Sequence, residues 1–284
     1  MQLQWLADRP GRLSSFLKGE LRMSTALMNK LKWGDAIQVN GTPQHTDFAV
    51  QPGDRITVRL DEPAPEYPAE FAPLAVLYED DHILAVDKPA GILIHPSHSQ
   101  NCGTLANFVI GYYEQTGQRS AFHPVTRLDR DTFGVVLLAK NAYMHTLLQE
   151  ADIEKIYHGY VLGGPAEAQG IIDAPIARRP MPSLLRCIHP DGKPSVTAFS
   201  VLERDASGAL LALRPITGRT HQLRLHCAHQ GFPILGDPQY GTAESMALSQ
   251  MLGYTYQRLC AKSVAFTHPI TGEHLVITSN MHPK

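Results

Sequence analysis

The segment RLDRDTFGVVLLAKN, residues 127–141, joins a charged loop to a continuous apolar run. The loop half carries two aspartates and two arginines within five positions, and the run from Phe133 onward is rich in valine and leucine. A short apolar run of this composition predicts a strand buried in a sheet. Polar groups at the mouth of such a strand are well placed to line a cleft, although a charged loop with local ion pairs explains them equally well.

The chain from residue 74 onward follows the same pattern of short strands broken by glycine and proline. Because strands and helices do not alternate strictly, a doubly wound parallel sheet is disfavoured. We therefore predict an α+β domain over residues 74–284, built on a mixed or antiparallel β-sheet. Further strands are expected at 74–80, 82–89, 155–163, 195–203, 209–216 and 275–279, and helices at 104–115, 141–151 and 220–230, the last with Thr220 as N-cap and Gly231 as its end.

Residues 1–60 have the pattern of a separate, small α/β domain. Leucine and phenylalanine recur at helical spacing over 13–21, and a second helix is expected from Ser24 as N-cap to Gly34. A strand at 37–39, the turn Asn40-Gly41 and an alternating strand at 55–60 complete it. The proline-rich, acidic segment DEPAPEYPAEFAP, residues 61–73, predicts an extended linker between the two domains.

Composition restricts the class of protein. With 43% hydrophobic and 18% charged residues, the 284-residue chain can bury a substantial core. It has no apolar run of bilayer length, and its start does not resemble a secretory signal, so we expect a cytoplasmic protein without a membrane partner. The net charge is −2, but residues 1–60 carry a net +3. A polyanionic partner would have to meet local basic surface.

Cysteine and histidine spacing argues against a metal or a disulfide framework. The four cysteines are far apart and none forms a CxxC pair. His226 and His229 are three positions apart, but neither has a third ligand at a recognised metal spacing. We therefore predict no metal site.

Two further features could carry chemistry. If a helix starts near Thr220, His221 and Arg224 lie on one face, and Arg224 could hold a carboxylate elsewhere ionised and oriented; the alternative is a solvated helix face. Tyr157 lies in an expected strand. A tyrosine there commonly serves packing, but it could also stack on a base and present its phenol to it.

Taken together, the motifs resemble the RluA family of pseudouridine synthases, in that family's order. Residues 12–60 resemble the small RNA-binding module of ribosomal protein S-four. The matching segments of the second domain are YED 78–80, DKPAG 87–91, RLDRDT 127–132 with Gly134, KIY 155–157, GKP 192–194 with Thr197, TGRTHQLR 217–224, GD 236–237 with YG 240–241, and HP 268–269 with TG 271–272.

The resemblance implies a role for several residues. Asp129 matches the catalytic aspartate, Tyr157 the tyrosine that packs on the target base, and Arg224 the arginine that pairs with the aspartate. Arg127 matches the arginine that holds the space of the flipped base. We further expect substrate contacts from Thr220, His221 and Leu225, and RNA contacts by the N-terminal module from Arg12, Lys30 and Lys32. Thr126 and Phe133 depart from the family pattern, which has histidine and serine or threonine there.

The resemblance predicts an enzyme that isomerises specific uridines of ribosomal or transfer RNA to pseudouridine. The reaction is redox-neutral, and no cofactor motif is present, so no cofactor is expected. The expected partner is structured RNA, and a monomer is the default. One alternative is a catalytically silent RNA-binding or ribosome-assembly factor. Another is a hydrolase, although the chain has no nucleophile elbow and no metal set.

Overall fold

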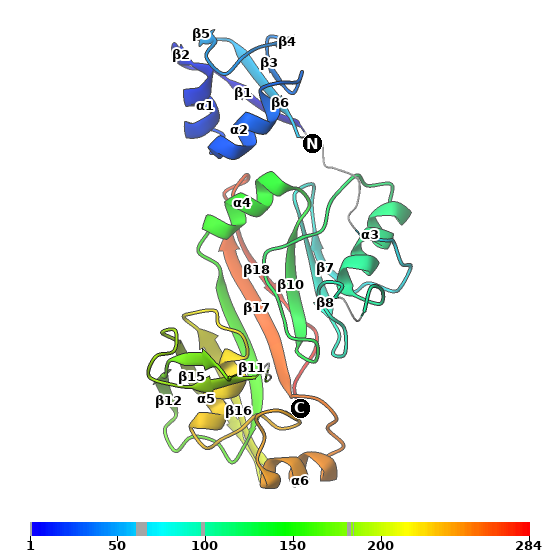
Figure 1. The fold of residues 1–284 in the computed structure, drawn as a ribbon, viewed down its shortest axis with the longest axis vertical. Coiled ribbons are helices and arrows are strands. Elements are labelled where there is room, and N and C mark those ends of the chain that lie inside the picture. Colours follow the sequence, from blue (N-terminus) through cyan, green and yellow to red (C-terminus); the bar gives the residue numbers. More distant parts are fainter. Residues whose placement is uncertain (1, 61–66, 98–99, 181–182, 184) are drawn as a thin grey trace.

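The computed structural model describes residues 2–60, 67–97, 100–180, 183 and 185–284. An N-terminal unit stands at one end of the molecule, next to α4, and the remainder is organised on one long sheet (Figure 1). The elements of the N-terminal unit are β1 Gln2–Leu6, β2 Gly11–Arg12, α1 Leu13–Gly19, α2 Thr25–Leu31, β3 Ile37–Val39, β4 Thr42–Pro43, β5 Ala49–Val50 and β6 Arg55–Arg59.

The N-terminal unit forms as its local signals predict. The side chain of Ser24 accepts a hydrogen bond from the backbone N–H of Leu27 and caps α2. Asn40 and Gly41 both have positive φ, 53° and 80°, which suits the tight turn between β3 and β4. The sheet order is β1-β6-β3-β4, so β1, which was not expected, covers one edge of β6.

The large sheet is mixed, which confirms the predicted α+β fold. Its main path is β12-β15-β16-β11-β17-β10-β8-β7, with β18 beside β17 and β9 beside β10. All neighbouring strands are antiparallel except β10 and β17. The elements are β7 Val76–Glu79, β8 Ile83–Lys88, α3 Leu105–Gln115, β9 His123–Pro124, β10 Phe133–Ala139, α4 Ala142–Glu150, β11 Glu154–Leu162, β12 Gln169–Asp173, β13 Ile176–Arg178, β14 Arg186–Ile188, β15 Val196–Arg204, β16 Gly208–Pro215, α5 Gln222–His229, α6 Ala243–Met251, β17 Leu259–Thr267 and β18 His274–Thr278.

Strands β8 and β10 are buried on both faces. Leu84 and Val136 belong to the apolar cluster that α3 covers, whereas Ile83 and Val135 belong to the cluster that α4 covers. Every residue of both strands is therefore buried. This double cover explains why the sequence shows continuous apolar runs instead of alternation.

Several local features differ from the prediction: β9 and β12–β14 were not expected, and neither were the three that follow. Strand β17 was missed because Lys262 and Ser263 interrupt its apolar pattern. Helix α6 was missed because its buried face is formed by Ser245 and Ser249, which have no hydrophobic period. The N-cap of α5 is His221 and not Thr220, because the Gln222 side chain binds the preceding loop and leaves Thr220 exposed.

The N-terminal unit packs on α4. The phenol of Tyr143 donates a 2.5 Å hydrogen bond to the carbonyl of Leu21, and Arg22 lies 3.5 Å from Glu150. Of the expected linker 61–73, residues 61–66 lie outside the described residues. The rest of it contacts α3, where the backbone N–H of Glu70 donates to the carbonyl of Asn107.

The helices are short. α3, with 11 residues, is the longest. Within the described part of the chain, no helix combines the length and the apolar character needed to cross a membrane.

Candidate active site

Asp129 lies in the loop between β9 and β10, and the protein holds this loop at several points. The Thr126 hydroxyl accepts a 2.9 Å hydrogen bond from the backbone N–H of Leu137, so Thr126 fastens the loop to β10. The backbone N–H of Thr132 donates to the carbonyl of Asp129 and closes a turn. The Thr132 hydroxyl accepts from the side chain of Gln257, which lies just before β17.

The side chain of Lys88 holds the same turn by hydrogen bonds. Its side chain is fully buried, and its ammonium donates 2.9 Å hydrogen bonds to the carbonyls of Pro89, Ile92 and Arg130. Burial lowers the pKa of Lys88 to about 8, against the opposing influence of Asp131 and Asp129. The ammonium thus links the end of β8 to the residue that follows Asp129.

Gly134 brings the Asp129 loop close to the middle of the sheet. It pairs with Ala261 of β17, and Ala261 pairs on its other side with Tyr157 of β11. Gly134 has φ 111°, and a Cβ placed there would lie 2.3 Å from the Ala261 carbonyl oxygen. Only glycine allows this approach. As a result, only β17 separates the start of β10 from Tyr157 on β11.

Arg224 of α5 is the centre of the site. Its side chain is 4% exposed, and its Nε and Nη2 donate 2.7 Å hydrogen bonds to the two carboxylate oxygens of Asp237. Nη2 also donates to Gln239, and Nη1 donates a 3.0 Å hydrogen bond to Oδ2 of Asp129. Burial alone would lower the pKa of Arg224, but Asp237 and Asp129 raise it above its usual value. The guanidinium is therefore charged and held in one orientation.

The two carboxylate oxygens of Asp129 are not equivalent. Oδ2 faces Arg224 at 3.0 Å and Nε2 of His221 at 3.9 Å. Oδ1 accepts no hydrogen bond from any residue that the structure describes. The side chain is 29% exposed. One oxygen is thus fixed, and the other is free to meet a molecule that arrives from solvent.

His221 is strained and oriented by Tyr240. Its backbone has φ 59°, a left-handed conformation that costs on the order of 1–3 kcal/mol for a residue other than glycine. The Tyr240 phenol accepts a hydrogen bond from the backbone N–H of Arg186 and lies 2.8 Å from Nδ1 of His221. If the phenol donates its hydrogen to Nδ1, the imidazole hydrogen lies on Nε2, on the side of Asp129. Burial lowers the pKa of His221, and Arg224 adds to this while Asp129 opposes it.

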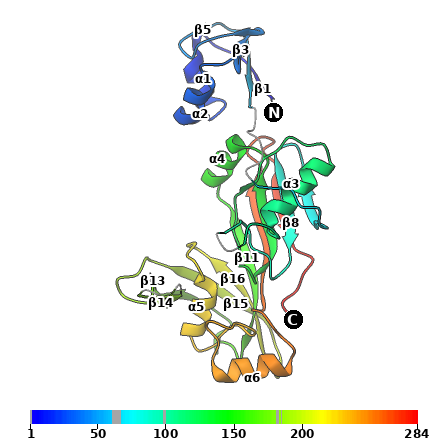
Figure 2. The same ribbon diagram turned by 45° about the vertical axis from the view of Figure 1, so that its right-hand side comes forward.

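The other polar residues of α5 anchor the helix to the sheet. The Gln222 amide donates to the carbonyl of Val196 and the hydroxyl of Thr197. Both ring nitrogens of His226 have partners, with Nδ1 2.9 Å from the Thr197 hydroxyl and Nε2 3.0 Å from the Ala174 carbonyl. His226 therefore serves the docking of α5 on β15 and β16, which Figure 2 shows side by side.

Tyr157 lies close enough to Asp129 to sense its charge. The side chain is half-buried and packs against the apolar cluster under α5. Burial, and to a smaller extent Asp129, raises the pKa of the phenol far above its usual value of 10. The phenol is therefore neutral at ordinary pH.

The structure brings some predicted residues together and separates others. Arg224 and His221 lie 3.0 and 3.9 Å from Asp129, and the charge of Asp129 acts on Tyr157. Arg127 is exposed two positions before Asp129, and Thr220 is exposed beside His221, while Leu225 is buried against Ile176 and Tyr240. Arg12, Lys30 and Lys32 lie in the N-terminal unit, with Arg12 at the start of α1 and both lysines at the end of α2.

Sequence reasoning missed the surroundings of Arg224. Asp237 and Tyr240 were matched to the family pattern without a role and Gln239 was given none, although the three supply most of its partners. The available signal was an aspartate in a glycine-rich turn, and nothing local says which cation it meets. Phe133, which departs from the family pattern, is buried against Tyr256 and the guanidinium of Arg258.

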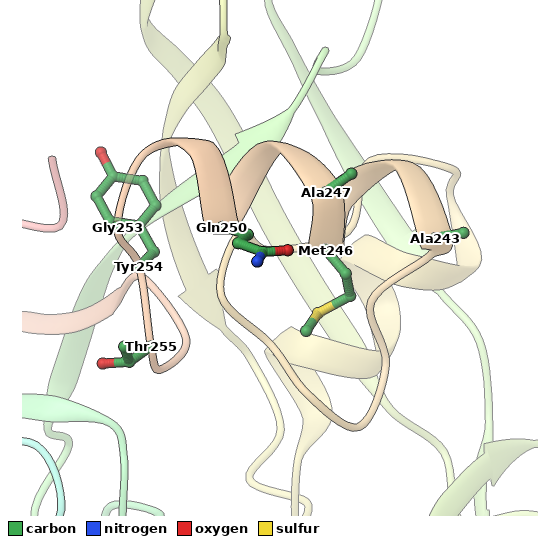
Figure 3. Close-up of a pocket in the computed structure, with 7 residues that line it drawn as sticks. All are labelled: Ala243, Met246, Ala247, Gln250, Gly253, Tyr254 and Thr255. Atoms are coloured by element: carbon green, nitrogen blue, oxygen red, sulfur yellow. The ribbon is translucent and has the colours of Figure 1, made fainter.

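A separate surface hollow of about 550 Å³ lies beside α6 (Figure 3). Its lining offers hydroxyls, an amide and a thioether but no carboxylate, imidazole or cationic side chain. Tyr254 and Thr255 supply hydroxyl groups, but no described lining residue is a base that could activate them. Its lining residues are Ala243, Met246, Ala247, Gln250, Gly253, Tyr254 and Thr255.

Comparison with known proteins relates most of the chain to one group of enzymes. The family model described as RNA pseudouridylate synthase matches residues 82–229. The chain is 36% identical over 264 residues to the uncharacterized RNA pseudouridine synthase YjbO of Bacillus subtilis, covering 90% of this chain and 91% of that one. It is 35% identical over 255 residues to ribosomal large subunit pseudouridine synthase D of Xanthomonas campestris pv. campestris, covering 86% and 76%. The structure of human RNA Pseudouridylate Synthase Domain Containing 4 is 25% identical, with a TM-score of 0.60 over 73% of this chain and 88% of that one.

Proposed function

This chain belongs to the RluA family of RNA pseudouridine synthases, and from that premise we propose that it isomerises specific uridines of ribosomal or transfer RNA, with Asp129 as the reacting carboxylate. The observation that carries the proposal is the asymmetry of the Asp129 carboxylate. Arg224 holds Oδ2 at 3.0 Å, while Oδ1 is free and the side chain is partly exposed. A nucleophilic carboxylate has to be ionised, oriented and reachable in this way.

The isomerisation defines what the site has to do. The bond between C1′ of the ribose and N1 of uracil breaks, the base turns, and a bond from C1′ to C5 forms. The C5 proton leaves and N1 gains a proton, so that no oxidant or reductant is needed. Asp129 either bonds to C1′ or stabilises a glycal-type intermediate, and both routes require an ionised carboxylate at that carbon.

The neighbouring side chains would handle the base. Tyr157 stacks on the uracil, and its neutral phenol, or a water beside it, relays the proton from C5. His221 offers its Nε2 side to the substrate next to Asp129. Arg127 and Thr220 are exposed at the rim of the site and would contact the flipped nucleotide. Leu225 would affect the substrate indirectly, because it packs on Tyr240, which orients His221.

The rest of the chain would select the RNA. A paired uridine has to be flipped out at a cost of about a few kcal/mol, which favours loops and distorted helices as targets. The N-terminal unit would add affinity through Arg12, Lys30 and Lys32, because neutralising phosphates strengthens binding irrespective of sequence. Substrates of this kind place the proposed activity in the cytoplasm.

The test is a pseudouridine map of total RNA from cells with and without this gene. We expect one or a few sites to disappear, to return with the wild-type gene, and to stay absent with Asp129→Asn, which keeps the shape of the side chain but cannot ionise. Asp131→Asn is the matched control. Asp131 is paired with Arg130, so this variant should restore the sites. Restoration by Asp129→Asn would remove Asp129 from its role.

Two other outcomes would favour the alternatives. If every pseudouridine persisted without the gene and the purified protein bound candidate transcripts without modifying them, the chain would be an RNA-binding or ribosome-assembly factor. Release of free uracil from those transcripts would indicate a hydrolase. Isomerisation at constant mass supports the synthase.

A further inference from the structure

Trp33 places a large aromatic surface in water at the end of α2. Its side chain is 79% exposed. The chain has two tryptophans, and the other one, Trp5, packs against the N-terminal core. Trp33 therefore contributes little to the stability of the fold, and its ring is available to a partner.

The surroundings of Trp33 are suited to nucleic acid. The ammonium of Lys32 lies 5.0 Å from the ring centroid, over the ring. The ring of His45 approaches edge-on at 6.1 Å, and Lys30 lies on the last turn of α2. Because the side chain is 79% exposed in spite of these contacts with Lys32 and His45, most of the ring surface is open to a flat group. An aromatic face beside lysines is the combination that single-stranded nucleic acids bind, with bases on the ring and phosphates on the cations.

Charge in the N-terminal unit supports an anionic partner. Its acidic residues Asp8 and Glu20 are already paired with Arg9, and Asp54 accepts from Asn40 and Gln51. Among the described residues, six of its cations have no carboxylate partner, against three carboxylates, Asp35, Asp47 and Asp54, without a cation. The six cations are Arg12, Lys18, Lys30, Lys32, Arg55 and Arg59.

We propose that Trp33 is a stacking platform for one unpaired base of the RNA, outside the catalytic site, with Lys30 and Lys32 contacting the adjacent phosphates. The proposal rests on the proposed function in that the partner is RNA. It adds that the enzyme recognises a single-stranded nucleotide with its N-terminal unit, which stands away from α5 (Figures 1 and 2). The helix dipole by itself accounts for Lys30 and Lys32 at the C-terminal end of α2. It does not account for the exposed indole of Trp33.

The chain allows a direct test, because Trp5→Phe leaves Trp33 as its single tryptophan. The indole N–H of Trp5 is buried and has no acceptor among the described residues, so phenylalanine removes an unpaired donor there. The full-length Trp5→Phe protein is titrated with a 12-nucleotide oligouridylate and with an RNA duplex of equal length, and binding is followed independently by anisotropy of labelled RNA. Stacking predicts quenching of Trp33 emission by the single strand, and little quenching by the duplex at equal saturation.

A second set of variants measures the contribution of the ring. Trp33→Leu should raise the Kd for the oligouridylate by about tenfold, and Trp33→Phe should raise it less, because a smaller ring still stacks. Met251→Ala, at a side chain that is 84% exposed on α6, should leave the Kd unchanged. These readouts do not depend on turnover, so failure of isomerisation would refute the proposed function without touching this result.

Three outcomes would overturn the proposal. One is unchanged Trp33 emission at saturating oligouridylate. Another is equal quenching by duplex and single strand, which would mean that the ring lies near phosphates without stacking. The third is an emission change that follows protein concentration without RNA, which would assign the Trp33 surface to a second copy of the chain.

Discussion

The guanidinium of Arg224 is divided between two carboxylates. Asp237 takes two of its hydrogen bonds at 2.7 Å, and Asp129 takes the one from Nη1. Lysine carries the same charge but lacks the planar fork that makes these contacts at once. Arg224→Lys should therefore lower the rate of isomerisation by about 100-fold, because a shift of about 1 Å in a reacting group has that effect. The measurement is the single-turnover rate of isomerisation on a transcript that contains the target uridine.

Asp237→Asn tests whether the anchoring of Arg224 by Asp237 matters apart from the contact of Arg224 with Asp129. It leaves the buried Arg224 without its main counter-ion, so the free energy of unfolding should fall by about 3 kcal/mol, measured by urea denaturation. The rate should fall as well, because Nη1 loses its fixed position beside Asp129. A near-wild-type rate in both Arg224→Lys and Asp237→Asn would refute the ion-pair account.

The pKa of Tyr157 has a consequence for the pH dependence of the reaction. Burial and the charge of Asp129 hold this pKa above its usual value, so the phenol stays protonated from about pH 6 to pH 9 and does not titrate there. Tyr157→Phe should lower the rate by about 100-fold, and by the same factor across this range. If the phenolate were the active form, the ratio of wild-type to variant rates would instead rise about tenfold with each pH unit, and a pH–rate profile of both proteins distinguishes the two cases.

At the scale of elements, the parallel contact of β10 with β17 positions the Asp129 loop. It consists of two residue pairs, Phe133 with Cys260 and Gly134 with Ala261. Gly134→Ala would place a methyl group 2.3 Å from the Ala261 carbonyl oxygen, so the strands must separate and the loop must move. We expect the free energy of unfolding to fall by about 3 kcal/mol or more, with loss of turnover, measured by urea denaturation and by isomerisation assay.

Gly117→Ala is the matched control for this prediction. Gly117 also has positive φ, 70°, but nothing lies within 4 Å of the added methyl group. Its cost should be limited to about 1–2 kcal/mol of backbone strain, without loss of turnover. If both substitutions lowered the free energy of unfolding and the turnover equally, the positive φ of Gly134 would explain its effect. The close approach of Gly134 to β17 would then not be needed to explain it.

Local patterns predicted some elements well and failed for others, for physical reasons. The apolar runs of β8 and β10 were predicted because both strands are covered on both faces. The N-cap of α2 was predicted because a serine side chain satisfies its backbone locally. Strand β17 has polar residues in its middle because Lys262 donates to the carbonyl of Ser279, a contact with a distant segment that no periodicity reveals.

At the scale of the whole molecule, one apolar cluster continues from the N-terminal unit into the layer between α4 and the sheet. Among the residues that the structure describes, none of the groups around Asp129 belongs to the N-terminal unit. Deleting 1–60 should therefore weaken RNA affinity by about tenfold or more, with the single-turnover rate at saturating RNA within about threefold of wild type. Filter binding and single-turnover assays check this.

The deletion also uncovers Tyr143, which is buried under Leu21 in the whole chain. Thermal unfolding of the truncated protein is therefore the necessary companion measurement. A truncated protein that is folded, binds RNA as tightly as the whole chain and no longer turns over would contradict the division of labour between the two parts.

The sequence by itself determined the α+β class, the buried strands β8 and β10, and the candidate residues of the site, because periodicity, caps and motif order are properties of neighbouring residues. The contact of Arg224 with Asp129, 95 positions away, was expected from the family resemblance and not from local pattern. Only the tertiary structure decided the contact of Lys88 with Arg130, 42 positions away. It also decided that Asp237 shares Arg224 and that the two oxygens of Asp129 differ. Such contacts arise when separate strands and loops pack together, and the residues on either side of a charged group do not specify its partner.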